Sequence, residues 1–507
     1  GSIDVQADSL AMSTNLQDAL RQATMSAGDI RLRGTDITLT GAKLDATDTL
    51  SLSARNDLTI TAAKSSHTAD LEVISGSMGN RTRGGTEAAG SRMAHVSGEW
   101  QQALGSQLNA GGNLSLNAGR DVTFTGSQAS AAGSTRVQAG GAINIRAEST
   151  TNTTHLDANS RTSSVSNDRQ EERLTVSALG GDQGVTLVAG NRLLAEGAQI
   201  DSKEGRIGVS ARDVTIKDAR SRTQDLDSEN KREGKTKSHR EEQTEREIST
   251  GSTFSGREGV TVIGREGDVT VTGSALHSEQ GAIALQAKQD VTLNTATERE
   301  SALSEERSQK KGFLKKSSSH SVAHDATTRE KGSLLSGNSV SVSAGNDLTV
   351  TGSAIAADQD VNLQAGRNVD IGAATETDTH YRLEEKKKSG LLSSGGIGFT
   401  IGKQSSKHEI DEKGRTQSQS VSTVGSSQGS VNITAGNQLH IGGADLVAGK
   451  DLALTGDSVT IDPGVDAHTR KETYEQKQSG LSVALSGTVG GALNTAVSSA
   501  QQARKEG

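Results

Sequence analysis

Apolar residues return at a fixed interval of 21 residues between positions 339 and 372. Val340 and Val342 are followed 21 residues later by Val361 and Leu363, and both pairs alternate with small polar residues. Alternation with a period of two is typical of strands that bury one face. Recurrence at about 20 residues is typical of a solenoid, in which each repeat adds a coil that packs on its neighbours. The sequence therefore predicts stacked coils and not a single compact sheet.

The composition suits thin, repeated cores. Only seven of the 507 residues are aromatic, and hydrophobic residues make up 31%. Conventional domains would need roughly three or four wide cores at this length, and few large side chains are available to fill them. The formal net charge of −8 gives no basic face for nucleic acid. The absence of cysteine excludes disulfides, thiolate metal sites and cysteine nucleophiles.

No apolar run in the sequence has the length of a transmembrane helix. The chain begins with Gly1 and Ser2, without a methionine or a signal peptide. We therefore expect it to be a segment of a longer protein.

Strand pairs alternate along the chain with excursions that lose the two-residue period. The strand pairs predict one all-β rod over residues 1–465, a right-handed parallel β-helix with rungs of about 21 residues. The larger unit is about 70–90 residues, namely two rungs and one excursion. The predicted excursions are residues 64–106, 148–181, 218–257, 296–334 and 373–427, and residues 466–507 form a terminal excursion that leads out of the repeats.

Triplets such as Gly119-Arg120-Asp121 and Gly345-Asn346-Asp347 recur where the predicted strands turn. We expect the glycines to adopt positive φ and the acids to bond nearby backbone groups. The turn acids suggest a calcium ladder as an alternative. One acid per turn supplies too few oxygens for an ion that takes about six to eight, so no metal or cofactor site is predicted. The turn acids considered are Asp57, Asp121, Asp347 and Asp451.

The excursions are of two kinds. Residues 220–247 hold eight basic and eight acidic residues, which suits a solvated helix, a long polar hairpin or disorder. Residues 388–403 instead alternate apolar and small residues after a charged run, which predicts an amphipathic strand. Related segments follow Tyr474 and surround Phe313 and Leu314.

Together these features resemble the haemagglutinin repeats of two-partner-secretion exoproteins. The resemblance rests on the Gly-Asn/Arg-Asp-Leu/Val repeats and on charged segments that end in Lys-Ser-Gly-Leu-Leu…Gly-Phe-Thr-Ile-Gly. That family includes the filamentous haemagglutinins and the contact-dependent growth inhibition effectors, and the interrupted rungs are most similar to the C-terminal-side repeat region of the effectors. The resemblance implies a parallel β-helix that is exported through a partner barrel, associates with the target cell's outer membrane and helps to deliver a C-terminal toxin.

Other chemical motifs have simpler explanations. Gly425-Ser426-Ser427-Gln428-Gly429 matches a nucleophile elbow formally, but a predicted strand follows it where a helix is needed. His320 and His324 lack the glutamate of a zinc-protease helix and are interpreted as solvated loop histidines. Each excursion contains a histidine, which allows a pH response. Aromatic platforms for sugar rings are lacking, so we expect no enzyme.

The amphipathic excursions are the candidate contact sites with a membrane or a partner. Their apolar residues suit a hairpin that enters a membrane, or one that covers the flank of the rod. The predicted contact residues are Leu391, Leu392, Ile397, Phe399, Ile401, Leu481, Val483 and Leu485.

Two functions remain open. The first is a secreted or cell-surface segment that contacts the target cell's outer membrane or a surface receptor during toxin delivery. The second is the stalk of a host-directed adhesin whose excursions bind a protein or glycan.

Overall fold

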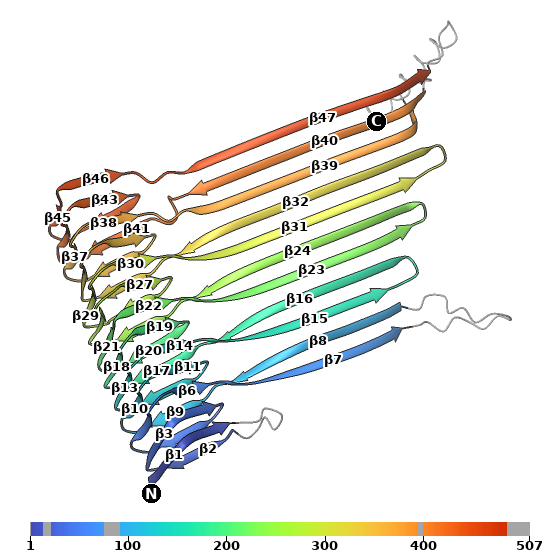
Figure 1. Cartoon of the computed structure of the whole chain (residues 1–507). Helices are drawn as coiled ribbons and strands as arrows, with labels where there is room; N and C mark the ends of the chain where they lie inside the picture. The colour runs from blue at the N-terminus through green and yellow to red at the C-terminus, as the bar shows by residue number, and fades with distance from the viewer. Residues whose placement is uncertain (1, 14–21, 76–91, 394–398, 484–507) are drawn as a thin grey trace.

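The computed structural model describes residues 2–13, 22–75, 92–393 and 399–483, and these residues form strands without helices. The strands build a rod of stacked coils with a sheet of long hairpins on one side (Figure 1). The fold is an all-β parallel β-helix, as predicted. Within this part of the chain, no helix has the length and apolar character that a membrane span requires.

The coils have three faces of parallel strands. The first face runs in the order β1 (Ser2–Ser13), β3 (Asp29–Thr40), β5 (Leu50–Ala54), β10 (Leu114–Ala118), β13 (Ser134–Ala139), β18 (Gly184–Ala189), β21 (Arg206–Ala211), β26 (Gly259–Gly264), β29 (Ala282–Ala287), β34 (Ser339–Ala344), β37 (Val361–Ala365), β42 (Val431–Ala435) and β45 (Leu452–Thr455).

The second face continues from β3, which spans the bend between the two faces. Its further strands are β6 (Leu58–Thr61), β11 (Val122–Thr125), β14 (Ile143–Arg146), β19 (Arg192–Glu196), β22 (Asp213–Lys217), β27 (Val269–Thr272), β30 (Val291–Asn294), β35 (Leu348–Thr351), β38 (Val369–Gly372), β43 (Gln438–Gly442) and β46 (Ser458–Asp462).

The third face is a separate sheet of shorter strands. They are β2 (Thr24–Ala27), β4 (Lys43–Ala46), β9 (Gln107–Ala110), β12 (Gln128–Ala131), β17 (Ser177–Gly181), β20 (Ala198–Ser202), β25 (Thr253–Gly256), β28 (Ala275–His277), β33 (Leu334–Gly337), β36 (Ala354–Ala357), β41 (Ser422–Ser426) and β44 (Ala444–Val447).

The long hairpins form an antiparallel sheet of their own, which we call the hairpin sheet. Its strands are β7 (Ala63–Ser75), β8 (Arg92–Leu104), β15 (Glu148–Asn159), β16 (Ser163–Thr175), β23 (Ala219–Glu233), β24 (Thr236–Thr250), β31 (Ala296–Lys311), β32 (Lys315–Lys331), β39 (Glu376–Ser393), β40 (Phe399–Thr416) and β47 (Ala467–Val483).

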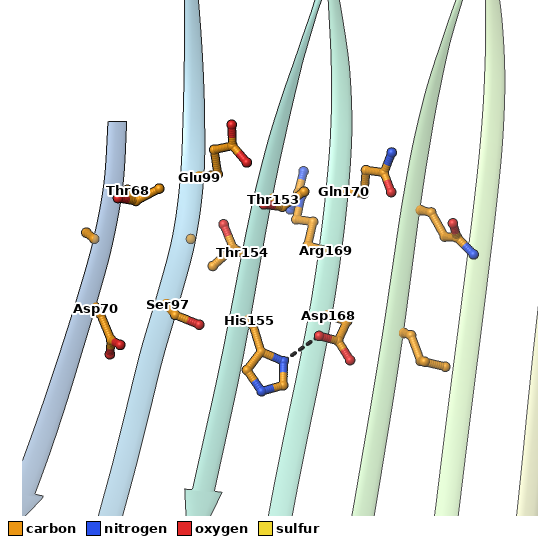
Figure 2. A pocket seen from close by; sticks show the side chains of 14 residues that line it. Thr68, Asp70, Ser97, Glu99, Thr153, Thr154, His155, Asp168, Arg169 and Gln170 are labelled. Carbon is orange, nitrogen blue, oxygen red and sulfur yellow. Dashed lines mark hydrogen bonds and ion pairs between the residues drawn. The ribbon is translucent and has the colours of Figure 1, made fainter. Parts of the chain in front are cut away.

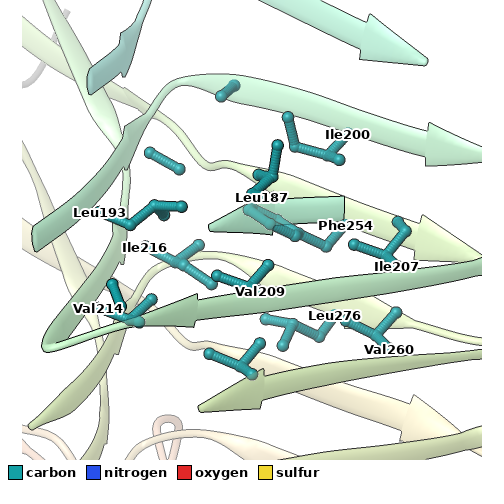
Figure 3. Packing of buried hydrophobic residues seen from close by; sticks show 14 of the residues in the cluster. Leu187, Leu193, Ile200, Ile207, Val209, Val214, Ile216, Phe254, Val260 and Leu276 are labelled. Atoms are coloured by element: carbon teal, nitrogen blue, oxygen red, sulfur yellow. The ribbon is translucent and has the colours of Figure 1, made fainter. Parts of the chain in front are cut away.

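The 21-residue recurrence sets the register between coils. Val340 pairs with Val361 on the first face, and Leu348 pairs with Val369 on the second. The alternate residues point inward and fill the rod. Figure 3 shows this core between the three faces, where side chains such as Leu187, Ile216 and Phe254 are fully buried. The predicted thin core of branched aliphatic residues is confirmed.

The glycines of the turn triplets have a different role from the one predicted. Neither Gly119 nor Gly345 has a positive φ. A Cβ on Gly119 would instead clash with the carbonyl oxygen of Arg55 in the preceding coil, and one on Gly345 would clash with that of Lys288. Close stacking of the turns therefore requires these glycines, and the expectation of positive φ at the triplets was wrong.

Positive φ occurs at another corner, before the third face. Gly41 has a φ of 61°, and a Cβ added there would lie 2.7 Å from the Cβ of Ala63. Ala63 is the first residue of a hairpin in the following coil. Gly197 repeats this arrangement with Ala219. These glycines thus permit the tight corner and also leave room for the hairpin above it.

The turn acids bond the backbone, as predicted for corner residues. The amide of Asp121 donates to the Asp57 carboxylate (3.3 Å), the amide of Ala142 to Asp121 (2.7 Å) and the amide of Asn368 to Asp347 (3.1 Å). Asp451 lies at a different corner, where its amide donates to the Ser430 hydroxyl at 3.4 Å.

A ladder of buried serines runs inside the rod where the chain enters the third face. The Ser252 hydroxyl accepts the amide of Ala198 (3.0 Å) and donates to the Lys217 carbonyl (2.7 Å). The Ser252 amide in turn donates to the Ser274 hydroxyl (3.0 Å). The buried serines with such bonds are Ser106, Ser127, Ser177, Ser252, Ser274, Ser333, Ser353 and Ser422. The ladder satisfies backbone groups at the corner from which the hairpins leave.

We predict that Ser252→Ala lowers the free energy of unfolding by about 1–3 kcal/mol, because the Ala198 amide and the Lys217 carbonyl lose a buried partner. Denaturant unfolding and amide exchange at Ala198 measure the effect. The exposed Ser319→Ala on the hairpin sheet is the control and should change stability by less than about 0.5 kcal/mol. Equal stability of the two variants would contradict a structural role for the ladder.

Candidate partner-contact surface

Each hairpin pairs with the next one, so that the hairpins form a continuous sheet beside the rod (Figure 1). Contacts between neighbouring hairpins run through β8–β15, β16–β23, β24–β31 and β32–β39, and β40 pairs with the further strand β47. Residues 220–247, for which helix, hairpin and disorder were all open, form the β23–β24 hairpin. The pairing of separate excursions with each other was not predicted from the sequence.

Opposite charges face each other across the strands in the half of the hairpin sheet nearer the rod. Arg222 contacts Glu245 at 2.7 Å within one hairpin, while Arg382 contacts Asp325 at 2.8 Å between two hairpins. The pKa of the Asp325 carboxyl is held below its usual range, mainly by its hydrogen bond to Arg382. Because the pairs are solvent-exposed, each adds little stability, but together they favour this register over slipped alternatives.

The predicted contact residues gather at the end of the hairpin sheet that is farthest from the rod. Leu391 pairs with Ile401, and Ile401 pairs with Leu481 on the neighbouring strand. The Leu391 and Ile401 side chains are 41% and 55% exposed. Neither lies against the rod, so the structure does not support the alternative that these two side chains cover its flank.

The remaining predicted contact residues have different positions. Leu392 pairs with Thr400 and alternates to the opposite face from Leu391, so it does not share one apolar face as expected. The backbone of Phe399 pairs with that of Val483. Ile397 and Leu485 lie outside the described residues.

The turn between β31 and β32 adds two apolar side chains to this end. Phe313 is 87% exposed and Leu314 is 64% exposed. The carbonyl of Leu314 accepts the amide of Leu391 at 2.9 Å, which places the turn beside the β39–β40 hairpin. Leu314 has a φ of 63°, the only positive value at a non-glycine position in the described part of the chain.

A shallow depression of about 670 Å³ lies on one face of the first hairpins. Figure 2 shows His155 and Asp168 side by side in its lining, with Ser97 and Asp70 on the next two strands. His155 bonds Asp168 across the hairpin, and its Nε2 lies 2.7 Å from Asp157. These carboxylates, Asp168 first, raise the pKa of His155. His155 thus bridges the two strands of the hairpin through these carboxylates.

Two other sequence motifs have structural roles. The Ser426 hydroxyl donates to the Gln359 carbonyl and accepts the Gly429 amide at 2.8 Å, so it shapes a corner of the rod. His320 and His324 lie on β32 and not in a loop, which corrects their predicted location. His320 contacts Glu305 at 2.7 Å, a further bridge between strands of the hairpin sheet.

The family model described as a hemagglutinin repeat matches residues 6–161, 228–313 and 312–481. The chain belongs to the hemagglutinin-repeat family. These matches cover coils and hairpins together, which agrees with a repeating unit made of both.

Curated relatives extend this assignment. The chain is 57% identical over 223 residues, or 44% of its length, to the 16S rRNA endonuclease CdiA of Enterobacter cloacae. It is 42% identical over 256 residues, half of the chain, to the deoxyribonuclease CdiA of Dickeya dadantii. The tRNA nuclease CdiA-2 of Burkholderia pseudomallei is 31% identical over 99% of the chain. The hemagglutinin-repeat segment spans only 7%, 8% and 15% of these relatives, respectively. No solved structure matches it.

We predict that the β15–β16 hairpin is more protected at acidic pH than at alkaline pH. The folded-state pKa of His155 is raised, so its stabilising effect is complete below the unfolded value of about 6.5 and is lost as the pH rises through the folded value. Hydrogen exchange of these amides, corrected for intrinsic rates, measures the effect.

The control variant His155→Gln should show the same corrected exchange at both pH values. Greater protection of wild type at alkaline pH would contradict the prediction.

Proposed function

We propose that this chain is a non-catalytic scaffold and contact segment of a CdiA-type exoprotein, and that the far end of its hairpin sheet enters the outer membrane of a target cell. In this proposal the whole protein is secreted to the bacterial surface through a partner barrel and delivers a C-terminal toxin. The carrying observation is the row of exposed apolar residues Phe313, Leu314, Leu391 and Ile401 at one end of the sheet.

This row contributes little to folding. Its exposed side chains leave much of their apolar surface in water, and the left-handed backbone of Leu314 costs free energy of about 1–3 kcal/mol. Leu391 and Ile401 are each 15 residues from the rod-side end of β39 and β40, which carries the row roughly 50 Å from the rod. A surface that is strained, apolar and held away from the rod suits contact with another body.

The relatives support a role that is separate from the named nuclease activities. Their names give three different activities, a 16S rRNA endonuclease, a deoxyribonuclease and a tRNA nuclease, yet each matches this segment over 44%, 50% and 99% of its length, respectively. A segment common to proteins with different nucleic-acid targets does not set the target. We therefore place the activity in other parts of those proteins, and assign scaffold and delivery roles to this one.

The test is flotation of the 507-residue chain with vesicles made from outer-membrane lipids. The double variant Leu391→Asp, Ile401→Asp should bind at least about tenfold more weakly, because each apolar side chain contributes about 1.5–3 kcal/mol when it leaves water. The control Leu452→Asp, Ile461→Asp changes side chains of similar exposure, 46% and 66%, at the end of the rod.

Equal binding of wild type and the Leu391/Ile401 variant would contradict the membrane role. Binding of wild type to cells but not to protein-free lipid would instead favour the adhesin alternative, with a protein or glycan receptor.

A further inference from the structure

Ion pairs between acidic and basic residues, such as Arg382 and Asp325, lie in the half of the hairpin sheet nearer the rod. A different pattern begins toward its far end. Two rows of residues cross the four neighbouring strands β32, β39, β40 and β47. In the first row the paired residues are Ser318, Lys387, Ser405 and Lys477, and in the second row they are Lys316, Ser389, Lys403 and Ser479. Lysine and serine thus alternate along both rows and between them. We call these eight residues the lysine–serine grid.

The grid lies on one face of the sheet. Its two rows are two residues apart on every strand, and residues at i and i+2 share a face. All eight residues line a depression of about 600 Å³, together with Lys388, Gln404 and Gln478. The lining offers ammonium, hydroxyl and amide donors, and it contains no carboxylate.

The positive charge of the grid is only partly neutralised. Lys387 and Lys477 contact Glu385 and Glu475, two residues nearer the rod, at 3.4 Å and 3.1 Å. Lys316 and Lys403 form no ion pair with any described residue, and both side chains are exposed. The second row therefore carries uncompensated charge.

A further lysine increases this charge. Lys311 on β31 pairs directly with Lys316, and like charges in directly opposite positions destabilise a sheet. Elsewhere in the sheet Arg169 pairs directly with Asp225, so the sequence does place an acid opposite a base at some positions. Here it places serine or lysine opposite lysine, which leaves the charge for an anion from outside the chain.

The position of the grid indicates which anion it meets. Ile401 is two residues beyond Lys403 on the same strand, and Leu391 pairs with Ile401. The apolar row is therefore about 7 Å beyond the second lysine row. A sheet whose apolar end enters a bilayer brings lysines at this distance to the headgroup layer, where basic residues interact favourably with anionic lipids.

We propose that the lysine–serine grid binds the phosphate groups of anionic lipid headgroups, an inference that rests on the proposed membrane contact. The lysines supply charge, and the serine hydroxyls between them donate hydrogen bonds to phosphate oxygens. The grid holds the sheet at a fixed depth, because it meets the headgroups as the apolar row meets the hydrocarbon.

The test compares vesicles of phosphatidylcholine with vesicles of phosphatidylcholine mixed with phosphatidylglycerol. The grid variant is Lys316→Gln, Lys387→Gln, Lys403→Gln, Lys477→Gln. The matched control is Lys43→Gln, Lys203→Gln, Lys288→Gln, Lys450→Gln on the rod. Both sets remove four charges, and in both sets two lysines contact acids, Lys43 with Asp45 and Lys203 with Asp182 in the control.

Wild type and the rod control should bind the anionic vesicles at least about tenfold more tightly than neutral ones, since basic residues near an anionic surface are attracted to it. The preference should weaken with added salt. The grid variant should lose most of the preference and keep the neutral binding. An equal loss of the anionic preference in both variants, or no loss in the grid variant, would contradict the proposal that the lysine–serine grid binds lipid phosphate.

The two proposals fail separately in this experiment. Neutral-vesicle binding that is lost by Leu391→Asp, Ile401→Asp reports on the apolar row, whereas the difference between the two vesicle types reports on the grid. Inorganic phosphate is the third arm. If dilute free phosphate abolishes the anionic preference at constant ionic strength, the grid is a site for soluble phosphate and the lipid assignment is wrong.

Discussion

The whole structure depends on one spacing, the roughly 4.8 Å between neighbouring hydrogen-bonded strands. Parallel strands of successive coils have this spacing along the rod, and antiparallel strands of the hairpin sheet have it beside the rod. A hairpin contributes two strands, and successive hairpins leave the rod two coils apart, after β6, β14, β22, β30 and β38, while β47 leaves it after β46. Two strands therefore occupy the same length as two coils, and each hairpin arrives where it can pair with the last one.

This match explains how long polar hairpins are ordered at all. A two-stranded hairpin is marginally stable alone, and the β23–β24 hairpin has few apolar residues to bury. In the hairpin sheet its backbone groups pair on both sides, with β16 and β31. The corners make the repeat possible, because Gly41 and Gly197 leave room for the first residue of the next hairpin, and buried serines such as Ser252 satisfy the backbone there.

The coils were predictable because their information is local. The recurrence of Val340 at Val361 predicts both the strand and its register, and the period of two predicts which face is buried. The pairing between hairpins was not predictable from single excursions, because Arg382 and Asp325 are 57 residues apart and only the two-coil spacing brings them together. The role of Gly119 was missed for the same reason, since its constraint comes from Arg55 in another coil. The apolar contact residues were recognisable from alternation, but their distance from the rod was not.

The residues of the hairpin sheet vary differently in its two directions, across the strands and along them. Across the strands, the hairpin sheet repeats, so that equivalent residues of successive hairpins lie in rows. Along the strands, its chemistry changes with distance from the rod, from the paired charges of Arg382 and Asp325, through the lysines, to Leu391 and Ile401. A planar partner contacts the far edge of the sheet as a row of strands. It contacts neighbouring hairpins at the same depth only if their strands share this order of paired charges, lysines and apolar residues. Ser389 and Leu391 on β39 pair with Lys403 and Ile401 on β40 and lie beside Lys316 and Leu314 of the preceding hairpin, so these two neighbouring hairpins share the order. A membrane is such a partner, because its composition changes with depth and is uniform in the plane.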